Sequence, residues 1–114
     1  MVVIRGAVVA QNTKQDIATQ SVALFNEILS KNNFELQHVK AIFFSATKDL
    51  VASNPATAVR THFGLNKVAF MCFQEMHVEN SLPNCIRIAV FVDKDFEPTN
   101  CYVGGAKVLR PDLN

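Results

Sequence analysis

Residues 84–92 read Asn84-Cys85-Ile86-Arg87-Ile88-Ala89-Val90-Phe91-Val92, and this stretch decides the fold class. The run is apolar on both faces apart from Arg87, which is typical of a strand that lies inside a sheet with cover on both faces. A guanidinium keeps its proton, and its burial is unfavourable unless an anion or strong acceptors meet it. Arg87 therefore indicates an anion pocket, a structural ion pair with Glu75 or Asp93, or an edge-strand arginine with a solvated head group.

A second arginine has the same setting. Arg5 interrupts the apolar run Val2-Val3-Ile4-Arg5-Gly6-Ala7-Val8-Val9, which predicts a first strand. Strand alternation puts Cys85 and Ala89 on the same face as Arg87, and these small residues leave room for a ligand. Two arginines embedded in apolar strands predict a pocket for an anion.

Strand patterns recur along the chain and alternate with helical ones. Besides residues 2–9 we expect strands at about 39–47, 67–73 and 85–93, and a short strand or extended tail at 102–109. The class is therefore α/β or α+β with a mixed sheet. No linker or repeat interrupts the 114 residues, so we expect one domain over residues 1–114. Two helices cover only one face of such a sheet, and oligomerisation is the simplest cover for the other.

The two helices are expected at about residues 14–31 and 55–63. Thr13 is the expected cap of the first, and Asn32-Asn33 the expected end, because asparagine tolerates the left-handed conformation. For the second, Ser53 or Asn54 is the expected cap, with Pro55 in the first turn and Gly64 just past the end.

Composition excludes several classes of function. The formal net charge is +1 without a basic stripe, which argues against nucleic acid or a membrane surface as partner. No segment approaches the roughly 20 apolar residues of a membrane span, and the first residues do not form a signal peptide. Three cysteines without a secretion signal fit a reducing cytoplasm. Metal-ligand spacings and glycine-rich phosphate loops are absent, so we expect neither metal ligation nor phosphate-cradle chemistry.

One carboxylate and one thiol stand near the end of the third expected strand, where functional residues often collect. Glu75 either hydrogen-bonds a substrate hydroxyl or pairs with an arginine. Cys72 has no evident histidine or helix terminus nearby, so we expect a small buried thiol rather than a nucleophile. Arg60 lies one turn after Ala56 on the second helix and flanks its inward face. A group of cationic side chains with one carboxylate is suited to the binding of a small polyanion. If a reaction occurs, we expect one that needs positioning and charge stabilisation rather than proton transfer.

Short motifs spread over nearly the whole chain add a resemblance. They occur in the order, and close to the spacing, of the AroH-class chorismate mutases, a small trimeric type, which the chain therefore resembles. The matching segments are Ile4-Arg5-Gly6-Ala7, Ser45-Ala46-Thr47, Asp49-Leu50, Pro55-Ala56, Ala58-Val59-Arg60, Cys72, Gln74-Glu75-Met76, Cys85-Ile86-Arg87, Tyr102, Ala106 and Val108-Leu109-Arg110-Pro111-Asp112-Leu113.

The resemblance implies an α+β fold, with a mixed β-sheet and helices on one face. It also implies a pseudo-α/β barrel assembled as a homotrimer with active sites between subunits. The family converts chorismate to prephenate in aromatic amino acid biosynthesis, the shikimate pathway, without cofactor or metal. We therefore expect a cytoplasmic isomerase, with a non-catalytic trimeric module that binds a small dicarboxylate as the alternative.

By matching motif, the resemblance also assigns residues. Arg5 and Tyr102 would hold a substrate carboxylate, and Arg87 would meet the ether oxygen and a carboxylate. Glu75, with Cys72, would hold the ring hydroxyl. The remaining pocket residues, partly from the neighbouring subunit, would be Ala56, Arg60 and Leu109.

Three differences from the family pattern stand on or near the expected pocket wall. Asn54 stands where a phenylalanine is common, Thr57 stands where a lysine follows Pro-Ala, and the segment before Tyr102 is shorter. We expect Asn54 and Thr57 to affect substrate affinity more than chemistry. These two residues favour the binding-module alternative, whereas Arg87 and Glu75 favour the enzyme.

Overall fold

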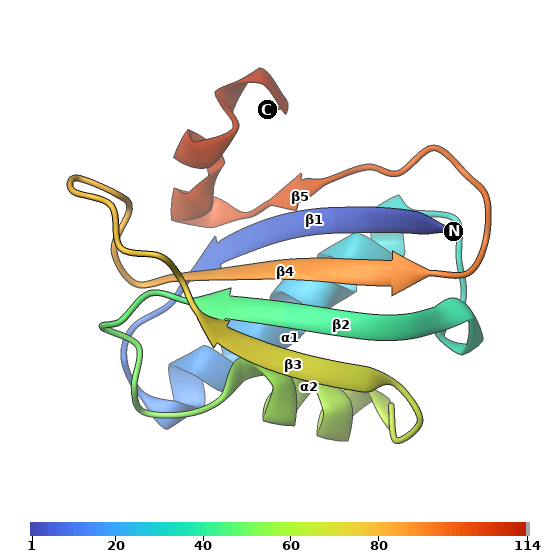
Figure 1. The fold of residues 1–114 in the computed structure, drawn as a ribbon, viewed down its shortest axis with the longest axis horizontal. Coiled ribbons are helices and arrows are strands. Elements are labelled where there is room, and N and C mark those ends of the chain that lie inside the picture. Colours follow the sequence, from blue (N-terminus) through green and yellow to red (C-terminus); the bar gives the residue numbers. More distant parts are fainter. Residues whose placement is uncertain (114) are drawn as a thin grey trace.

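A single mixed sheet organises the chain, as the computed structural model, which describes residues 1–113, shows (Figure 1). Its strands are β1 (Val2–Val9), β2 (Val39–Ala46), β3 (Ala69–Gln74), β4 (Cys85–Val92) and β5 (Cys101–Tyr102). They lie in the order β3-β2-β4-β1-β5. The central strand β4 is antiparallel to both β1 and β2. On the two edges, β3 pairs in parallel with β2, and β5 pairs in parallel with β1.

Both α-helices pack against the same face of this sheet, behind it in the view of Figure 1. They are α1 (Lys14–Lys31) and α2 (Pro55–Phe63), and three 3-10 helices complete the fold: η1 (Leu36–His38), η2 (Gly104–Leu109) and η3 (Pro111–Leu113). The predicted α+β class, with a mixed sheet and helices on one face, is confirmed. Within residues 1–113, no helix has both the length and the apolarity that a membrane crossing requires.

The ends of α1 are set by side chains. The Thr13 hydroxyl accepts a hydrogen bond from the Asp16 N–H at 3.0 Å, as expected for the cap. The reason predicted for the other end is wrong, because Asn32 is extended with φ −131° rather than left-handed. Its amide instead donates to the carbonyls of Ile28 at 2.9 Å and Thr99 at 3.0 Å. Asn32 therefore ends the helix by capping a carbonyl and ties it to the segment before β5.

Helix α2 follows the expected punctuation. Of the two expected caps it uses Asn54, whose side chain accepts from the Ala56 N–H at 2.9 Å. Pro55 occupies the first turn, and Gly64 ends the helix at φ +67°. That conformation suits a residue without Cβ, and the Gly64 N–H closes the helix on the Arg60 carbonyl.

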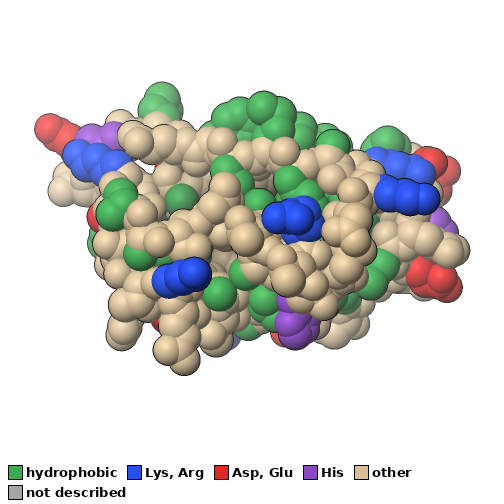
Figure 2. Space-filling view, turned by 90° about the horizontal axis from the view of Figure 1, so that it is seen from below, with side chains coloured by type: hydrophobic (Ala, Val, Ile, Leu, Met, Phe, Trp, Pro, Cys, Tyr) green, Lys and Arg blue, Asp and Glu red, His purple; other side chains and the backbone are tan. Residues whose placement is uncertain are grey.

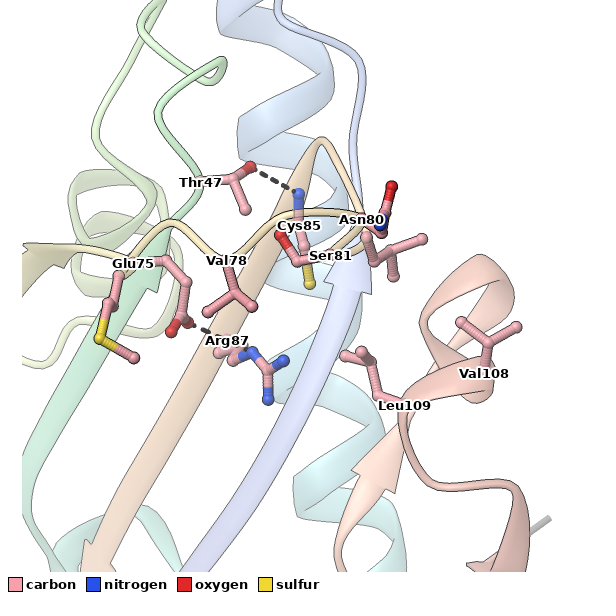
Figure 3. Close-up of a pocket in the computed structure, with 11 residues that line it drawn as sticks. Thr47, Glu75, Val78, Asn80, Ser81, Cys85, Arg87, Val108 and Leu109 are labelled. Carbon is pink, nitrogen blue, oxygen red and sulfur yellow. Dashed lines mark hydrogen bonds and ion pairs between the residues drawn. The ribbon is translucent and has the colours of Figure 1, made fainter.

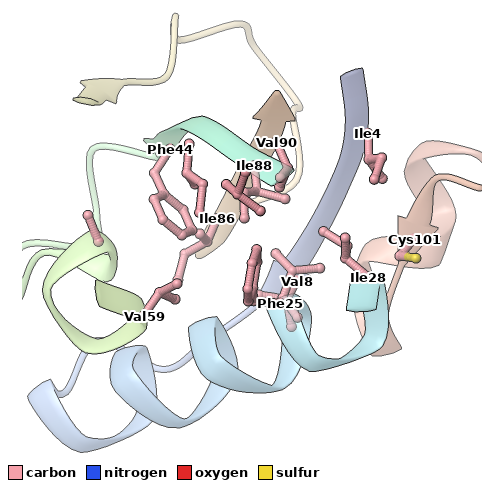
Figure 4. Close-up of a cluster of buried hydrophobic side chains, with 14 of the residues drawn as sticks. Ile4, Val8, Phe25, Ile28, Phe44, Val59, Ile86, Ile88, Val90 and Cys101 are labelled. Atoms are coloured by element: carbon pink, nitrogen blue, oxygen red, sulfur yellow. The ribbon is translucent and has the colours of Figure 1, made fainter. Parts of the chain in front are cut away.

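The hydrophobic core fills the space between the sheet and the two helices (Figure 4). Alternate strand residues face it, as the period of two in a strand requires. The fully covered side chains include Ile4, Phe25, Ile28, Ile42, Phe44, Val59, Ile86, Val90 and Val92.

Gly6 makes room for the short strand β5. A Cβ at this position would lie 2.5 Å from the Cys101 carbonyl oxygen, closer than real contacts allow. Without it, β5 pairs with β1 through Gly6–Cys101 and Ala7–Tyr102.

The second face of the sheet is largely open, and here the expectation of buried strands is wrong for the single chain. Arg87 is half-buried, and Arg5, predicted to be embedded, is exposed. Met71 and Phe73 are exposed on the edge strand β3. Figure 2, which views the molecule from that edge, shows hydrophobic side chains gathered along the upper rim, where the open face lies. An exposed apolar face of this kind is typical of an interaction surface.

The expected strand or extended tail at 102–109 is also wrong. Only Cys101–Tyr102 is strand, and Gly104–Leu109 is the 3-10 helix η2. Gly104 has φ +56°, which turns the chain out of the strand direction. Ala106 and Leu109 then pack on the open face beside Tyr102. The limits of the other strands differ only slightly from those expected.

Candidate functional site

An ion pair lies on the open face, near the end of the sheet where β3 ends and β4 begins (Figure 3). The Arg87 Nε lies 3.2 Å from Glu75 Oε1, and the side chains are 36% and 32% exposed. The same carboxylate oxygen accepts a hydrogen bond from the Ser45 hydroxyl at 2.7 Å. Of the two partners predicted for an Arg87 ion pair, Glu75 and Asp93, the structure shows Glu75. Figure 3 shows the terminal nitrogens of Arg87 on the side away from Glu75, so the guanidinium also presents donors to the space beyond.

Strand register explains why these residues meet. Ser45 on β2 lies opposite Arg87 on β4, and Ala46 lies beside Gln74 at the end of β3. The next residue, Glu75, donates its N–H to the Ala46 carbonyl at 2.8 Å, which keeps its backbone against β2. Its side chain therefore emerges beside Ser45 and reaches the arginine.

The ion pair forms part of the wall of a cavity of about 410 Å³. This volume lies in the range of small-molecule sites. Arg87 and Cys85 contribute from the sheet, the segment after β3 contributes Val78, and η2 contributes Leu109 (Figure 3). The other residues around it are Thr47, Glu75, Met76, Asn80, Ser81, Leu82 and Val108. A charged pair inside a mostly apolar enclosure suits a small anion that also has an apolar body.

Hydrogen bonds hold the far end of the loop that borders this cavity. The Asp49 carboxylate accepts from the Asn84 N–H at 3.1 and 3.2 Å and from the Thr47 hydroxyl at 2.5 Å. The Thr47 oxygen in turn accepts from the Cys85 N–H at 3.0 Å. The bond from Thr47 is the main reason that the pKa of Asp49 is lowered, and the Asn84 N–H adds to the effect. These contacts fix the loop where β4 begins.

Arg5 joins the pair from the neighbouring strand. A hollow of about 320 Å³ adjoins the ion pair, and its lining contains Arg5, Glu75, Arg87, Phe73 and Ala89. Arg5 stands opposite Ala89 in the register and is exposed. The three residues predicted to carry the chemistry are therefore brought together on one face.

Tyr102 lies in the same cross-sheet row as Arg87, with Ala7 between them. It is buried in a small apolar cluster with Ala7, and Leu109 packs against that cluster. Arg110 follows and forms two hydrogen bonds to Asp112, at 3.1 and 2.9 Å. These bonds are the main reason that the pKa of Arg110 is raised, and a hydrogen bond with Tyr102 contributes. The segment after β5, from Gly104 onward, thus covers Tyr102 in the single chain.

Cys72 is not brought to this cavity, and two expectations about it are wrong. Its side chain is exposed rather than buried, and it lies at a helix terminus, since its thiol donates to Asn54 Oδ1 at 2.8 Å at the start of α2. Partial burial of the sulfur raises its pKa, while hydrogen bonding with the Ala56 backbone and the Asn54 side chain opposes that shift. The net shift of the pKa is upward, which does not favour a thiolate.

Ala56 and Arg60 also lie outside the cavity. Both are residues of α2: Ala56 is buried against the core, and Arg60 is exposed. Of the eight predicted site residues, the single chain therefore groups Arg5, Glu75, Arg87, Tyr102 and Leu109 around one region of the sheet and leaves Ala56, Arg60 and Cys72 near α2. Within residues 1–113, no cluster of three histidine, cysteine, aspartate or glutamate side chains is placed to hold a metal ion.

Sequence reasoning assigned no role to Ser45 or to the pair Thr47 and Asp49. The available signal was weak, because hydroxyls and carboxylates after a strand most often make local turn contacts.

Comparisons with known proteins agree over almost the full chain. Residues 1–113 match the family model described as chorismate mutase type I. The chain is 36% identical over 115 residues to the chorismate mutase AroH of Bacillus subtilis (strain 168), which covers 97% of this chain and 91% of that protein. It is 31% identical to chorismate mutase AroH of Thermus thermophilus, over 96% of this chain and 93% of that protein. Among solved structures, a chorismate mutase from Clostridium thermocellum superposes with a TM-score of 0.90 at 36% identity, covering 95% and 99% of the two chains.

Proposed function

This chain belongs to the chorismate mutase type I family and is a chorismate mutase, and we propose that the cavity beside Arg87 and Glu75 is where chorismate rearranges to prephenate. The predicted resemblance to the AroH class is confirmed. The observation that carries the location of the site is the Arg87–Glu75 ion pair at the wall of a 410 Å³ cavity. The alternative of a non-catalytic binding module has no support from the comparisons.

The reaction sets modest chemical demands on the protein. One ether C–O bond breaks and one C–C bond forms within the same molecule, so no atom is gained or lost. No acid, base or nucleophile is required. The enzyme must hold the folded reactive conformer and stabilise negative charge that develops on the breaking ether oxygen.

Arg87 meets the second demand. Its Nε faces Glu75, and none of its side-chain N–H groups has a hydrogen-bond partner within residues 1–113. We assign its terminal nitrogens to the ether oxygen and one substrate carboxylate. A guanidinium already fixed beside a carboxylate needs little reorganisation when charge develops, and exclusion of water strengthens the interaction.

Glu75 and the flanking residues meet the first demand. The second oxygen of Glu75 is assigned to the ring hydroxyl of chorismate, since the first is engaged by Ser45 and Arg87. Arg5 and Tyr102 are assigned to a carboxylate, which the shared face of the sheet supports. Leu109 is assigned to the apolar wall.

We propose a homotrimer in which a neighbouring subunit completes the site. Met71 is 52% and Phe73 is 48% exposed, and both lie on β3, whose outer edge has no neighbouring strand within residues 1–113. Proteins normally cover an exposed apolar edge of this kind. The neighbour would supply Ala56 and Arg60. Cys72 makes no contact with the cavity in one chain, so its assigned role at the ring hydroxyl requires the assembled site. A cytoplasmic role in aromatic amino acid biosynthesis belongs to the same proposal.

The direct experiment is to mix purified protein with chorismate and follow the loss of chorismate spectroscopically, with light scattering on the same sample. We expect turnover and a mass about three times that of the 12.6 kDa chain. A folded protein that leaves chorismate at the uncatalysed rate would contradict the function, and an active monomer would contradict the shared site.

A further inference from the structure

We propose that Ser45 is a positioning residue for the rearrangement, because its hydroxyl holds Glu75 in the orientation that leaves the Arg87 guanidinium available to the substrate. The inference rests on the proposed function and concerns a residue to which neither the motifs nor the comparisons assign a role.

The geometry around Glu75 is asymmetric. Ser45 donates to Oε1 at 2.7 Å, and Arg87 Nε approaches the same oxygen only to 3.2 Å. The contact with Ser45 is a hydrogen bond, whereas the contact with Arg87 is an ion pair without hydrogen-bond geometry. The serine, and not the arginine, therefore sets the direction of the carboxylate.

A second arginine in the chain shows the arrangement that Ser45 prevents. Arg110 and Asp112 form two parallel hydrogen bonds at 3.1 and 2.9 Å, which is the strong bidentate geometry that arginine and carboxylate favour. Glu75 has no such bonds with Arg87. If both oxygens of Glu75 engaged the guanidinium fork, the fork and the carboxylate would satisfy each other and neither would be free for chorismate.

Strand pairing fixes the serine where it acts. Ser45 lies on β2 directly opposite Arg87 on β4 and beside Phe73 on β3, so its side chain stands on the open face between the two charged groups. It is half-buried, and the Glu75 backbone is held to the adjacent Ala46 carbonyl at 2.8 Å. Because the strands are held in this register, they can move little to compensate if the Ser45 hydroxyl is removed.

The test begins with Ser45→Ala and Ser45→Thr. Alanine frees Oε1 and allows Glu75 to close on Arg87, so we expect KM for chorismate to rise and kcat to fall, with kcat/KM lower by about 10- to 100-fold, the size of one hydrogen bond to a charged group. Threonine keeps a hydroxyl on the same carbon and suits a strand, so it should restore most of the activity. A matched control is Ser30→Ala, because the Ser30 hydroxyl donates to the Glu27 carbonyl on the exposed side of α1, away from the cavity. It should leave both constants unchanged.

A double-mutant cycle with Glu75→Ala separates positioning from packing. If Ser45 acts through Glu75, Ser45→Ala should have almost no further effect once Glu75 is alanine. Where Glu75→Ala turns over too slowly for kinetics, affinity for prephenate by calorimetry gives the same cycle. Thermal unfolding and light scattering of every variant confirm that the fold and assembly are retained.

The outcomes divide cleanly. The role of Ser45 would be overturned if the effects of Ser45→Ala and Glu75→Ala on kcat/KM multiplied in full in the double mutant. Near-normal kinetics of a folded Ser45→Ala protein would overturn it as well. In both cases the wild-type protein would still turn over chorismate. A wild-type protein that does not turn over chorismate would instead overturn the proposed function.

Discussion

Replacing Arg87 by alanine separates the catalytic and structural interpretations of this residue. The Arg87–Glu75 pair is about one-third exposed at both partners and lacks hydrogen-bond geometry, so it resembles a surface ion pair. Such pairs contribute less than about 1 kcal/mol to folding. We therefore expect Arg87→Ala to fold, with the free energy of unfolding lowered by no more than about that amount.

The effect on catalysis should be much larger. Loss of one neutral donor aimed at a developing negative charge lowers kcat by about 10²- to 10³-fold. A cation that faces the ether oxygen should matter at least as much, which corresponds to about 3–4 kcal/mol or more. Arg87→Lys keeps the charge but loses the planar fork and gains a more strongly hydrated head group, so it should recover only a small part of the activity.

Three measurements on the same samples decide the matter: circular dichroism, molar mass by light scattering, and kcat from the loss of chorismate. Folded Arg87→Ala protein with nearly normal kcat would exclude a catalytic role for Arg87. Variants that are unstable, with a surviving folded fraction of full activity, would show that Arg87 serves only the fold.

Three further predictions follow from the structure. Thr57 is exposed on α2 at a position where the family resemblance predicts a lysine. In the proposed trimer Thr57→Lys should lower KM with little change in kcat, because a contact at the rim of the site acts equally on ground and transition states, and a large rise in kcat would contradict this placement. The pKa of Asp49 is lowered in the fold, so its contribution to stability is present above the ordinary value of 3.8 and is lost as pH falls through the lower folded value. Thermal unfolding should therefore show a greater loss on acidification below about pH 3.8 for the wild type than for Asp49→Asn, and parallel curves would contradict the role of that carboxylate. Finally, refolding Arg60→Ala together with Arg87→Ala should restore activity at about a quarter of the sites of a randomly mixed trimer, because those interfaces carry both arginines, whereas a site within one chain would gain nothing.

Much of the fold was predictable because its signals are local. The first helix is confirmed at Lys14–Lys31, since Thr13 and the apolar stripe both depend on neighbours within a few residues. The pairing of β5 with β1 was not predictable, because it depends on the close approach that Gly6 permits to a strand far along the chain. The turn at Gly104, just after β5, was also missed, because a glycine in the sequence does not show which direction the chain takes after it.

The charged residues of the candidate site were predictable from the sequence, but the residue that holds Glu75 in place was not. Arg5, Glu75 and Arg87 were expected to act together, and the structure brings them to one hollow. The exposure of Arg5 was missed, because an apolar strand pattern does not distinguish cover by a helix from cover by another subunit. The bond from Ser45 to Glu75 was missed, because a hydroxyl in a strand has many possible partners until the register of three strands is known.

If chorismate becomes prephenate in the Arg87–Glu75 cavity, a crystal structure of the assembled protein with prephenate should show the product there. The oxygen that was the ether in chorismate should lie within about 3 Å of a terminal nitrogen of Arg87, with the ring hydroxyl at a similar distance from Glu75. Prephenate bound away from Arg87, with the cavity of Figure 3 empty, would contradict the account.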